Sequence, residues 1–470
     1  MDPITWTGSL GPFLNPLFAA LTAALAISVL AQILLSFFTG PGAEAQGDGT
    51  LAATRSPAEM AAAASRFLVL GLVAIAVLYG VQGFFSADPA RQGIFGAMAV
   101  RFWPVWVALI ATFALSIRFK GRLGLYGKLF DSPVGMAGFA IVMFWVFTAI
   151  FADTIATFNP LSQVSGMRNA VPGSFVRGQE GTIYLLGGDD LARDVFSRMV
   201  AGARRVLAIA PAATAFAFMV GITLGLPAGY FGGRFDTILS FFANLVLAFP
   251  VILLFYLLVT PEIRVTGIPI ILAAVLFIFP VIFLCVLWNS RYFTDPKKRN
   301  LYVGITLAIG LWAYSGLAFN LDPLGVWSME PNLLNVFVSV VFVNAPTVFR
   351  IVRGLTMDLK ARDYVSAAQT RGEGPWYIML WEILPNARGP LIVDFCLRIG
   401  YTTILLGTLG FFGLGVSPES PDWGSTINSG RGLLPILIMH PALVPALSLM
   451  SLVLGLNLLA DGLREESLRD

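Results

Sequence analysis

The chain has 470 residues, of which 57% are hydrophobic and 12% are charged, and its formal net charge is +3. A soluble domain carries about twice that charged share, so the composition excludes a water-soluble fold and predicts a membrane protein. The small net charge gives no indication of a nucleic-acid partner. Both cysteines, Cys285 and Cys396, fall within apolar stretches, which argues against a disulfide framework.

About eleven apolar stretches are long enough to cross a bilayer core, which takes about 20 residues of helix. They lie near 13–38, 67–85, 98–117, 134–155, 203–228, 236–259, 267–288, 301–318, 333–350, 391–413 and 434–460. Lipid leaves unpaired backbone groups unsatisfied, so each crossing is expected to be a helix. The predicted fold class is an all-α polytopic membrane protein.

Lysine and arginine are concentrated in alternate loops, at 39–66, 118–133, 289–300 and 351–390. Cytoplasmic loops carry an excess of these residues. We therefore expect these loops and the C-terminus to lie inside and the N-terminus outside. The segment at 40–50, GPGAEAQGDGT, is typical of a flexible loop.

The most informative polar interruption is DYVSAAQTRGEGPWYIMLWEILPNARGPLIV at 363–393. Residues 361–370 are good helix formers, with an apolar face of Tyr364, Val365 and Ala368. A glycine-rich break follows, and Pro375 is suited to open a second helix. We expect that helix to end at Pro385–Asn386 and to present a set of apolar residues, namely Trp376, Ile378, Met379, Leu380 and Ile383.

Exposed apolar residues on a pair of short helices indicate a surface that binds another protein. An amphipathic loop lying on the lipid surface would show the same pattern. The residues by themselves leave both interpretations open.

The run resembles the EAA loop of importer-type ABC permeases, which has two alanines, a glycine four positions later and a Leu-Pro about a dozen positions after that. The matching residues are Ala367, Ala368, Gly372, Leu384 and Pro385. The resemblance implies a coupling helix that sits in a groove on an ATPase subunit, with Asp363, Tyr364 and Trp376 in the same site. Ser366 stands where the family usually has glutamate, so the usual salt bridge to the ATPase lacks its acid, while docking is still expected.

Other stretches resemble the second permease of dipeptide and oligopeptide importers. LLGGDDLARDVFSRMVAGARRVL at 185–207 is similar to that branch's signature and matches it at Asp189, Arg193, Asp194 and Arg198. Further matching stretches are GYFGGRFD at 229–236, LAFP at 247–250, LPNARGPLIV at 384–393 and FFGLGVSPESPDWGSTINSGR at 411–431. Together they cover most of residues 126–470.

The resemblance implies a type I importer fold with six core spans, at 134–155, 203–228, 236–259, 333–350, 391–413 and 434–460. Three additional spans would occupy residues 1–125, and an inserted two-helix hairpin would occupy 261–332. The core would then divide into 126–260, with an outer segment at 156–202, and 333–470, with a cytoplasmic coupling loop at 351–390. Lipid-facing packing around the core is the simplest role for the five added spans.

Two outer segments, 156–202 and 414–433, carry the remaining candidate residues. Asp189 or Asp190 is expected to cap the helix of the second core span. Arg193 and Arg198 are expected either to snorkel to the interface or to contact a binding protein. The second segment has an interfacial tryptophan, Trp423, and is expected to be a membrane-surface plug or a binding-protein platform; it also carries Pro418, Pro421, Asp422 and Arg431.

The sequence contains no G-x-x-x-x-G-K-[ST] phosphate loop. The resemblance therefore implies that ATP and Mg²⁺ bind to two separate ABC ATPase subunits, and that this chain has no catalytic site, metal or cofactor. It also implies a second, related permease chain, a periplasmic solute-binding protein and a multi-pass location in a bacterial inner membrane. The implied activity is import of peptides or similar small solutes by alternating access. A bulky charge at Ala368, or Gly372→Pro, is expected to uncouple transport.

The main alternative is a secondary transporter that is not driven by ATP. Such carriers usually have acidic residues or broken paired helices within the membrane, and acids are nearly absent from these stretches. Arg398 is the clearest charge inside a predicted span, with Asp394 four residues earlier as its expected partner or, alternatively, a place in the pathway. His440 is the one histidine in the sequence, and a lone histidine does not make a metal site.

Overall fold

The computed structural model describes residues 2–38, 57–176, 181–414, 420–433 and 438–467. The predicted flexible loop at 40–50, Pro418 and residues 434–437 of the last predicted span lie outside this described part. The chain forms two compact units, one of residues 1–103 and 163–196 and one of 104–162 and 197–470. The outer segment from 163 to 196 is thus grouped with the N-terminal helices.

The first unit is a helical hairpin with a short outer subdomain. Its elements are η1 (Gly8–Leu10), α1 (Gly11–Phe38), α2 (Pro57–Phe85), α3 (Pro89–Arg101), β1 (Ser174–Phe175) and β2 (Ile183–Tyr184). Helix α1 packs along α2, and α2 packs against α3. The amide of Ile4 donates to the carbonyl of Gly173 at 3.0 Å. The N-terminus therefore lies beside the outer segment, as the predicted orientation requires.

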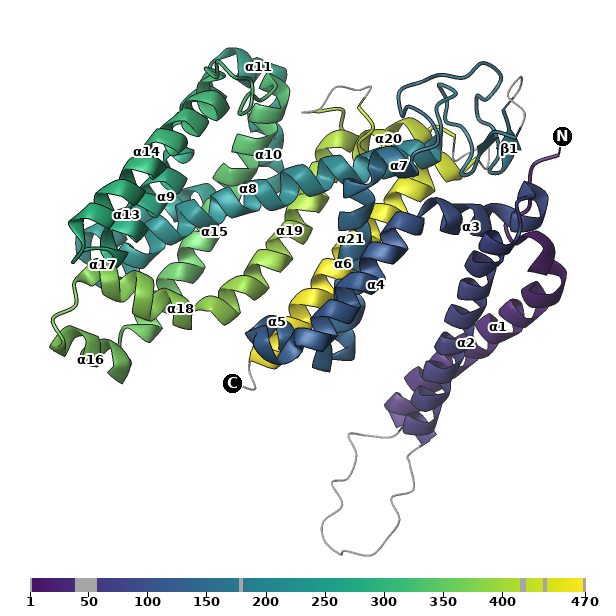
Figure 1. Cartoon of the computed structure of the whole chain (residues 1–470), viewed down its shortest axis with the longest axis horizontal. Helices are drawn as coiled ribbons and strands as arrows, with labels where there is room; N and C mark the ends of the chain where they lie inside the picture. Colours follow the sequence, from purple (N-terminus) through teal and green to yellow (C-terminus); the bar gives the residue numbers. More distant parts are fainter. Residues whose placement is uncertain (1, 39–56, 177–180, 415–419, 434–437, 468–470) are drawn as a thin grey trace, which may run out of the picture. The chain divides into compact units, whose positions relative to one another are not determined.

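The second unit holds the remaining helices (Figure 1). Before the coupling loop they are α4 (Trp103–Phe119), η2 (Lys120–Arg122), α5 (Gly124–Lys128), η3 (Leu129–Asp131), α6 (Pro133–Ile150), α7 (Ala152–Ile155), α8 (Val195–Phe231), α9 (Gly233–Leu247), α10 (Val251–Val259), α11 (Pro261–Val265), α12 (Ile268–Leu276), α13 (Ile278–Arg291), α14 (Pro296–Phe319) and α15 (Pro331–Leu359). After them come α16 (Asp363–Thr370), α17 (Pro375–Tyr377), η4 (Ile378–Ile383), α18 (Leu384–Asn386), α19 (Arg388–Phe411), α20 (Trp423–Arg431) and α21 (His440–Ser467).

Within the described residues, ten helices are long and apolar enough to cross a membrane, and a bent pair raises the count to eleven. Each of the eleven predicted stretches overlaps one of these. The predicted span over 236–259 corresponds to this bent pair, in which α9 and α10 meet at an angle of 83°. Pro250 stands at the break and has no N–H to continue the helical hydrogen bonds. The predicted span at 98–117 is also divided, since α3 ends at Arg101 and α4 starts at Trp103.

Helix α15 is the central helix of the second unit and is largely buried along its length. It packs against α9, α10, α12 and α19. Helices α6 and α21 form a tightly packed pair, and α21 also packs on α19 and α20. Close approach explains the pairing of α6 with α21, because a Cβ at Gly138 would lie 2.3 Å from the amide nitrogen of Leu459.

The two ends of this unit carry different segments. In Figure 1, α7 and α20 lie at one end, while α5, the C-terminal end of α21 and the short helices α16–α18 lie at the other. The hydroxyl of Ser132 is 3.5 Å from the carboxylate of Glu465, which places the basic loop at 118–133 beside the end of α21. This agrees with the predicted assignment of these loops to one side of the membrane.

Candidate functional site

The coupling loop contains the first predicted short helix, α16, and it ends in a hydrogen-bonded glycine turn. The amide of Gly372 donates to Gln369 at 2.9 Å, and the amide of Glu373 donates to Ala368 at 3.2 Å. These two bonds form a Schellman motif, which requires a left-handed residue after the helix. Gly372 supplies it with φ of 82°. The glycine in the motif is therefore needed for its backbone conformation.

The second predicted helix also exists, but it is not one regular helix. It begins with α17 at Pro375, continues as the π-helical turn η4, and ends in α18 at Asn386. The amide of Leu384 reaches back five residues to Met379, and Pro385 has no N–H to offer. Single π turns occur often at functional sites.

Most of the apolar residues of this second helix are buried, so the expectation that the helix presents them on its surface is wrong for these residues. Ile378, Met379 and Ile383 are at most 1% exposed. They pack with Val365 and Ala368 of α16, both fully buried. We call this set the loop core; its other buried members are Phe218, Leu226, Val348, Val352, Leu380, Ala387 and Leu391. The physical reason is that the two short helices bury their apolar faces against each other and against the spanning helices.

The exposed face of α16 consists of small and polar side chains. Asp363, Ser366, Ala367 and Thr370 are exposed, and their spacing of three, one and three residues places them on one side of a helix. Trp376 is 43% exposed and is the large hydrophobic residue that the turn presents. Of the other predicted site residues, Pro385 is exposed, while Tyr364 and Leu384 are half-buried. We call the exposed side of α16 the outer face of the coupling loop, and the side that packs in the loop core its inner face.

Charged side chains attach the coupling loop to the spanning helices. Lys360 donates to the carbonyl of Gly229 at 3.0 Å and to that of Tyr230 at 3.3 Å, at the C-terminal end of α8. A cation there satisfies carbonyls that lack helical partners. Arg371 donates to Glu382 at 2.8 Å and links the glycine turn to η4. The loop is therefore a packed and hydrogen-bonded part of the second unit.

The candidate residues of the first outer segment make internal contacts. Asp189 accepts from the amides of Leu191 and Arg193 and from the Arg193 side chain at 2.6 Å. Both side chains of this ion pair are at most 5% exposed. Asp189 therefore closes a turn several residues before α8 begins, so the expectation that it caps this helix is not met. Arg193 is buried and does not snorkel to the interface.

Arg198 joins separate outer segments of the second unit. Its guanidinium donates to the carbonyls of Pro160 and Ser420, each at 3.3 Å, and to the hydroxyl of Thr426 at 3.1 Å. The residue is 1% exposed, and the neighbouring Asp194 is fully buried. The matched signature residues thus make internal contacts in the outer segments. Because they are buried, they are not surface residues that a partner could contact directly.

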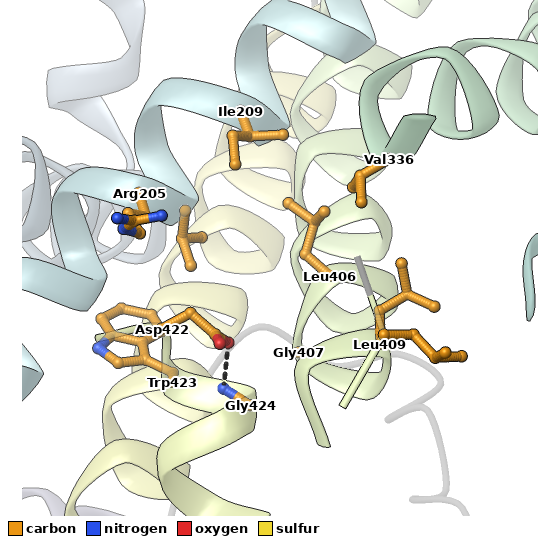
Figure 2. A pocket seen from close by; sticks show the side chains of 11 residues that line it. Arg205, Ile209, Val336, Leu406, Gly407, Leu409, Asp422, Trp423 and Gly424 are labelled. Carbon is orange, nitrogen blue, oxygen red and sulfur yellow. Dashed lines mark hydrogen bonds between the residues drawn. The ribbon is translucent and has the colours of Figure 1, made fainter. Parts of the chain in front are cut away.

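Trp423 was expected to be interfacial, and the structure instead buries it to 1% exposure. Its indole donates to the carbonyl of Met199 at 2.9 Å, and its ring packs edge-on against Trp145 at 5.0 Å. Asp422 caps α20 by accepting from the amide of Gly424 at 2.8 Å. Figure 2 shows this end of α20 beside a cavity of about 20 Å³ that Ile209, Val336 and Leu406 also line. Helix α20 is thereby fixed against α8 and α19.

The charge predicted inside a span has the partner that the sequence indicates. Arg398 of α19 donates to Asp394 at 2.6 Å, four residues earlier on the same helix. Its side chain is 9% exposed and that of Asp394 is 18% exposed. This pairing favours the structural interpretation of Arg398.

Comparison with known proteins identifies the family. The family described as "Binding-protein-dependent transport system inner membrane component" matches residues 304–465, from within α14 to α21. The glutathione transport system permease protein GsiD of Pectobacterium atrosepticum is 30% identical over 282 residues, which cover 60% of this chain and 71% of that protein. The chain belongs to this family of transport permeases. The match includes the whole coupling loop of the permease.

Further relatives of this permease come from peptide transporters. The dipeptide transport permease DppC of Haemophilus influenzae is 27% identical over 330 residues, covering 70% of this chain and 88% of DppC. The probable D,D-dipeptide transport permease DdpC of Escherichia coli is 25% identical over 348 residues, covering 74% and 91%. The permease is thus a member of the peptide-importer group of ABC permeases, with a type I importer fold.

Proposed function

We propose that this permease is the membrane subunit of an ATP-driven importer of peptides or similar small solutes. Two ATPase subunits would bind at the coupling loop, a second and related permease would complete the pathway, and a periplasmic binding protein would deliver the solute in a bacterial inner membrane. The names of the relatives, which transport glutathione and dipeptides, support this solute class.

The observation that carries the proposal is the construction of the coupling loop. Its inner face is packed into the second unit, and its outer face presents small and polar residues around Ala367. Small side chains allow the backbone of a helix to approach a partner closely, and a helix in a groove is a common mode of protein recognition. A loop anchored in this way passes a displacement of the docked subunit to α8, α15 and α19.

The burial of charged pairs favours this mechanism over a secondary transporter. The ion pair of Arg398 with Asp394 is internal to α19, so it does not provide the free carboxylate that an ion-coupled carrier needs. In the proposed importer, transport energy comes from the different contacts that two nucleotide states of the ATPase make with the coupling loop.

The test is co-purification of the tagged permease with any ABC ATPase encoded beside its gene, followed by ATP-dependent uptake of labelled dipeptides and glutathione in vesicles. Ala367→Arg adds a long side chain to the outer face and is expected to abolish co-purification. Gly121→Arg is the matched control, because it adds the same side chain at an exposed position in the basic loop at 118–133, with no atom within 4 Å of its Cβ. Uptake driven by a proton or sodium gradient, with no ATPase bound, would overturn the proposal.

A further inference from the structure

Trp381, in the middle of η4, binds the C-terminal end of α13, which belongs to the predicted inserted hairpin. Its indole N–H donates to the hydroxyl oxygen of Ser290 at 3.1 Å. The guanidinium carbon of Arg291 lies 4.7 Å from the centre of the Trp381 ring. Ser290 and Arg291 are the last two residues of α13, and Figure 1 places this end of α13 beside α17.

The hydrogen bond belongs to a directed chain. The Ser290 hydroxyl donates its one proton to the carbonyl of Leu287 at 2.9 Å, which leaves the oxygen to accept from Trp381. Ser290 is 7% exposed, so water does not readily replace either partner. A cation over the face of a tryptophan adds a second, electrostatic attraction. Two independent interactions therefore fix the position of one ring.

The hairpin that supplies these groups is itself held rigid at this end. Tyr302 of α14 stacks on Trp288 at 5.1 Å and on Tyr292 at 5.0 Å. Further up α13, Phe283, Val286 and Leu287 pack against the loop core. Lipid-facing packing accounts for the apolar middle of the hairpin, but it does not account for these bonds to the coupling loop.

The position of the Trp381 ring affects the position of α16, because both belong to the same packed loop. Trp381 lies within the π-helical turn, which is a rare backbone form. The adjacent Glu382 pairs with Arg371, which follows α16 directly and precedes Gly372 of the glycine turn. The orientation of η4 therefore sets the orientation of α16 and of its exposed face.

We propose that Ser290 and Arg291 are positioning residues for coupling. By holding Trp381, they keep the outer face of α16 in the orientation that the ATPase engages. The hairpin thus regulates how efficiently ATP hydrolysis drives transport. This inference rests on the proposed function, since it assigns the hairpin a role in the same coupling step.

The test uses the full-length permease, with Cys285→Ala and Cys396→Ala to remove the native thiols. Spin labels on Ala367→Cys and Thr294→Cys report the distance between α16 and the hairpin turn. A second readout is taken on the permease that keeps Ala367 and carries no label: in the complex with its ATPase, partner permease and ligand-loaded binding protein, it is the stimulation of ATP hydrolysis by the binding protein. The variants are Ser290→Ala, Arg291→Ala and Trp381→Phe, and Lys297→Ala, an exposed lysine of the same hairpin, is the matched control.

Ser290→Ala and Arg291→Ala are each expected to broaden the distance distribution and to reduce stimulation about two- to fivefold, which is the size of one neutral hydrogen bond for Ser290 and of one surface cation–π contact for Arg291. Arg291→Lys should retain part of the stimulation that Arg291→Ala loses, because the cation is kept. In the Trp381→Phe background, Ser290→Ala should have no further effect, whereas Arg291→Ala should keep its effect. A protein held only by general packing would not show this pattern.

The inference is overturned if both variants match Lys297→Ala in distance and in stimulation. Spin-label distances in the permease alone keep the test valid even if an altered complex fails to assemble. Failure of the unmodified permease to bind any ATPase would instead contradict the proposed function, so the two failures are distinguishable.

Discussion

Arg353 of α15 binds Asp236 of α9 through two hydrogen bonds, one of which, from the terminal nitrogen Nη2, measures 2.6 Å. Asp236 ends the matched stretch GYFGGRFD, and Arg353 lies on the helix that leads into the coupling loop. The pair is mostly shielded, with side-chain exposures of 30% and 14%. It therefore connects the bent pair α9–α10 to the base of the loop.

We expect Asp236→Ala to lower the stability of the permease by about 1–3 kcal/mol, because it leaves a partly buried guanidinium without its carboxylate. Arg353→Lys should lose part of this amount, since lysine cannot bind both oxygens. The measurement is the thermal midpoint of the detergent-solubilised protein. Lys298→Ala removes a surface pair with Asp295 and leaves the Asp295 cap of α14 in place, so it should change the midpoint little; an equal loss of stability in this control would contradict the assignment.

Ala367 and Ala368 are adjacent, but a charge has different consequences at each. Ala368 is fully buried in the loop core, so Ala368→Glu places an unpaired carboxylate in an apolar site and should destabilise the loop by about 3–5 kcal/mol. Ala367 is exposed, and Ala367→Glu should leave stability unchanged while weakening association with the ATPase. Loss of transport in a charged Ala368 variant therefore reports on packing of the loop core and not on docking.

Limited proteolysis separates these two outcomes. Trypsin should cleave at Arg371 faster in Ala368→Glu than in the unmodified protein, because the glycine turn loosens when α16 leaves the loop core. Ala367→Glu should be cleaved at the unmodified rate. Equal cleavage of both variants would show that α16 does not distinguish an inner from an outer face.

Gly372 should tolerate substitution in an order set by its backbone alone. A Cβ added at this position would meet no atom within 4 Å, whereas the backbone φ is 82°. Gly372→Asn is therefore expected to be mild, and Gly372→Ala should cost about 1–2 kcal/mol. Gly372→Pro should cost about 3 kcal/mol or more, because proline fixes φ near −65° and removes the N–H that bonds to Gln369. Thermal midpoints should follow this order, and a lower midpoint for Gly372→Ala than for Gly372→Pro would contradict it.

The sequence located the spans and the coupling loop because both depend on local patterns. Apolar length marks the helices that cross the membrane, and Gly372 and Pro375 mark the turn and the start of the second short helix. The break at Pro250 was also visible in the residues, but a proline within an apolar run does not reveal an angle of 83°.

Burial in the coupling loop could not be read from the sequence in the same way. The apolar residues from Ile378 to Ile383 fit a docking face and a packed face equally well, since the pattern does not say which partner covers it. Trp423 and Arg198 posed the same problem on the outer side, because their partners are distant in sequence. Ser290 and Trp381 are 91 residues apart, and no spacing rule links them.

Asp422 gives a pH-dependent prediction. Burial raises the pKa of this carboxyl above its usual value, while bonds from Ser425 and Gly424 act in the opposite direction. A carboxyl with a raised pKa in the folded state contributes stability that is fully present below the unfolded pKa, about 3.9, and is lost as the pH rises through the folded pKa. Asp422→Asn keeps an acceptor for the helix cap and removes the buried charge.

We therefore expect Asp422→Asn to be at least as stable as the unmodified permease at pH 7 and to lose this part of the pH dependence. Asp422→Ala should be less stable by about 1 kcal/mol, since it removes the cap. Thermal midpoints between pH 4 and pH 8 provide the measurement. If the midpoint of Asp422→Asn fell more steeply with rising pH than that of the unmodified permease, this would contradict the direction of the pKa shift.

Gly202 of α8 and Trp423 of α20 are in such close contact that their substitutions should not be additive. A Cβ on Gly202 would lie 2.4 Å from the Trp423 ring, so Gly202→Ala must displace the ring and should cost about 1–3 kcal/mol. Trp423→Leu removes a buried aromatic side chain and its bond to Met199, at about 3–5 kcal/mol. In the double variant the new methyl group enters space that the ring has left, so the combined loss should be smaller than the sum of the two.

Gly400→Ala is the matched control, because the nearest atoms lie 3.9 Å from its Cβ, and it should be neutral or slightly stabilising. Thermal midpoints of the four proteins measure the coupling, and strict additivity would mean that α20 does not rest on Gly202.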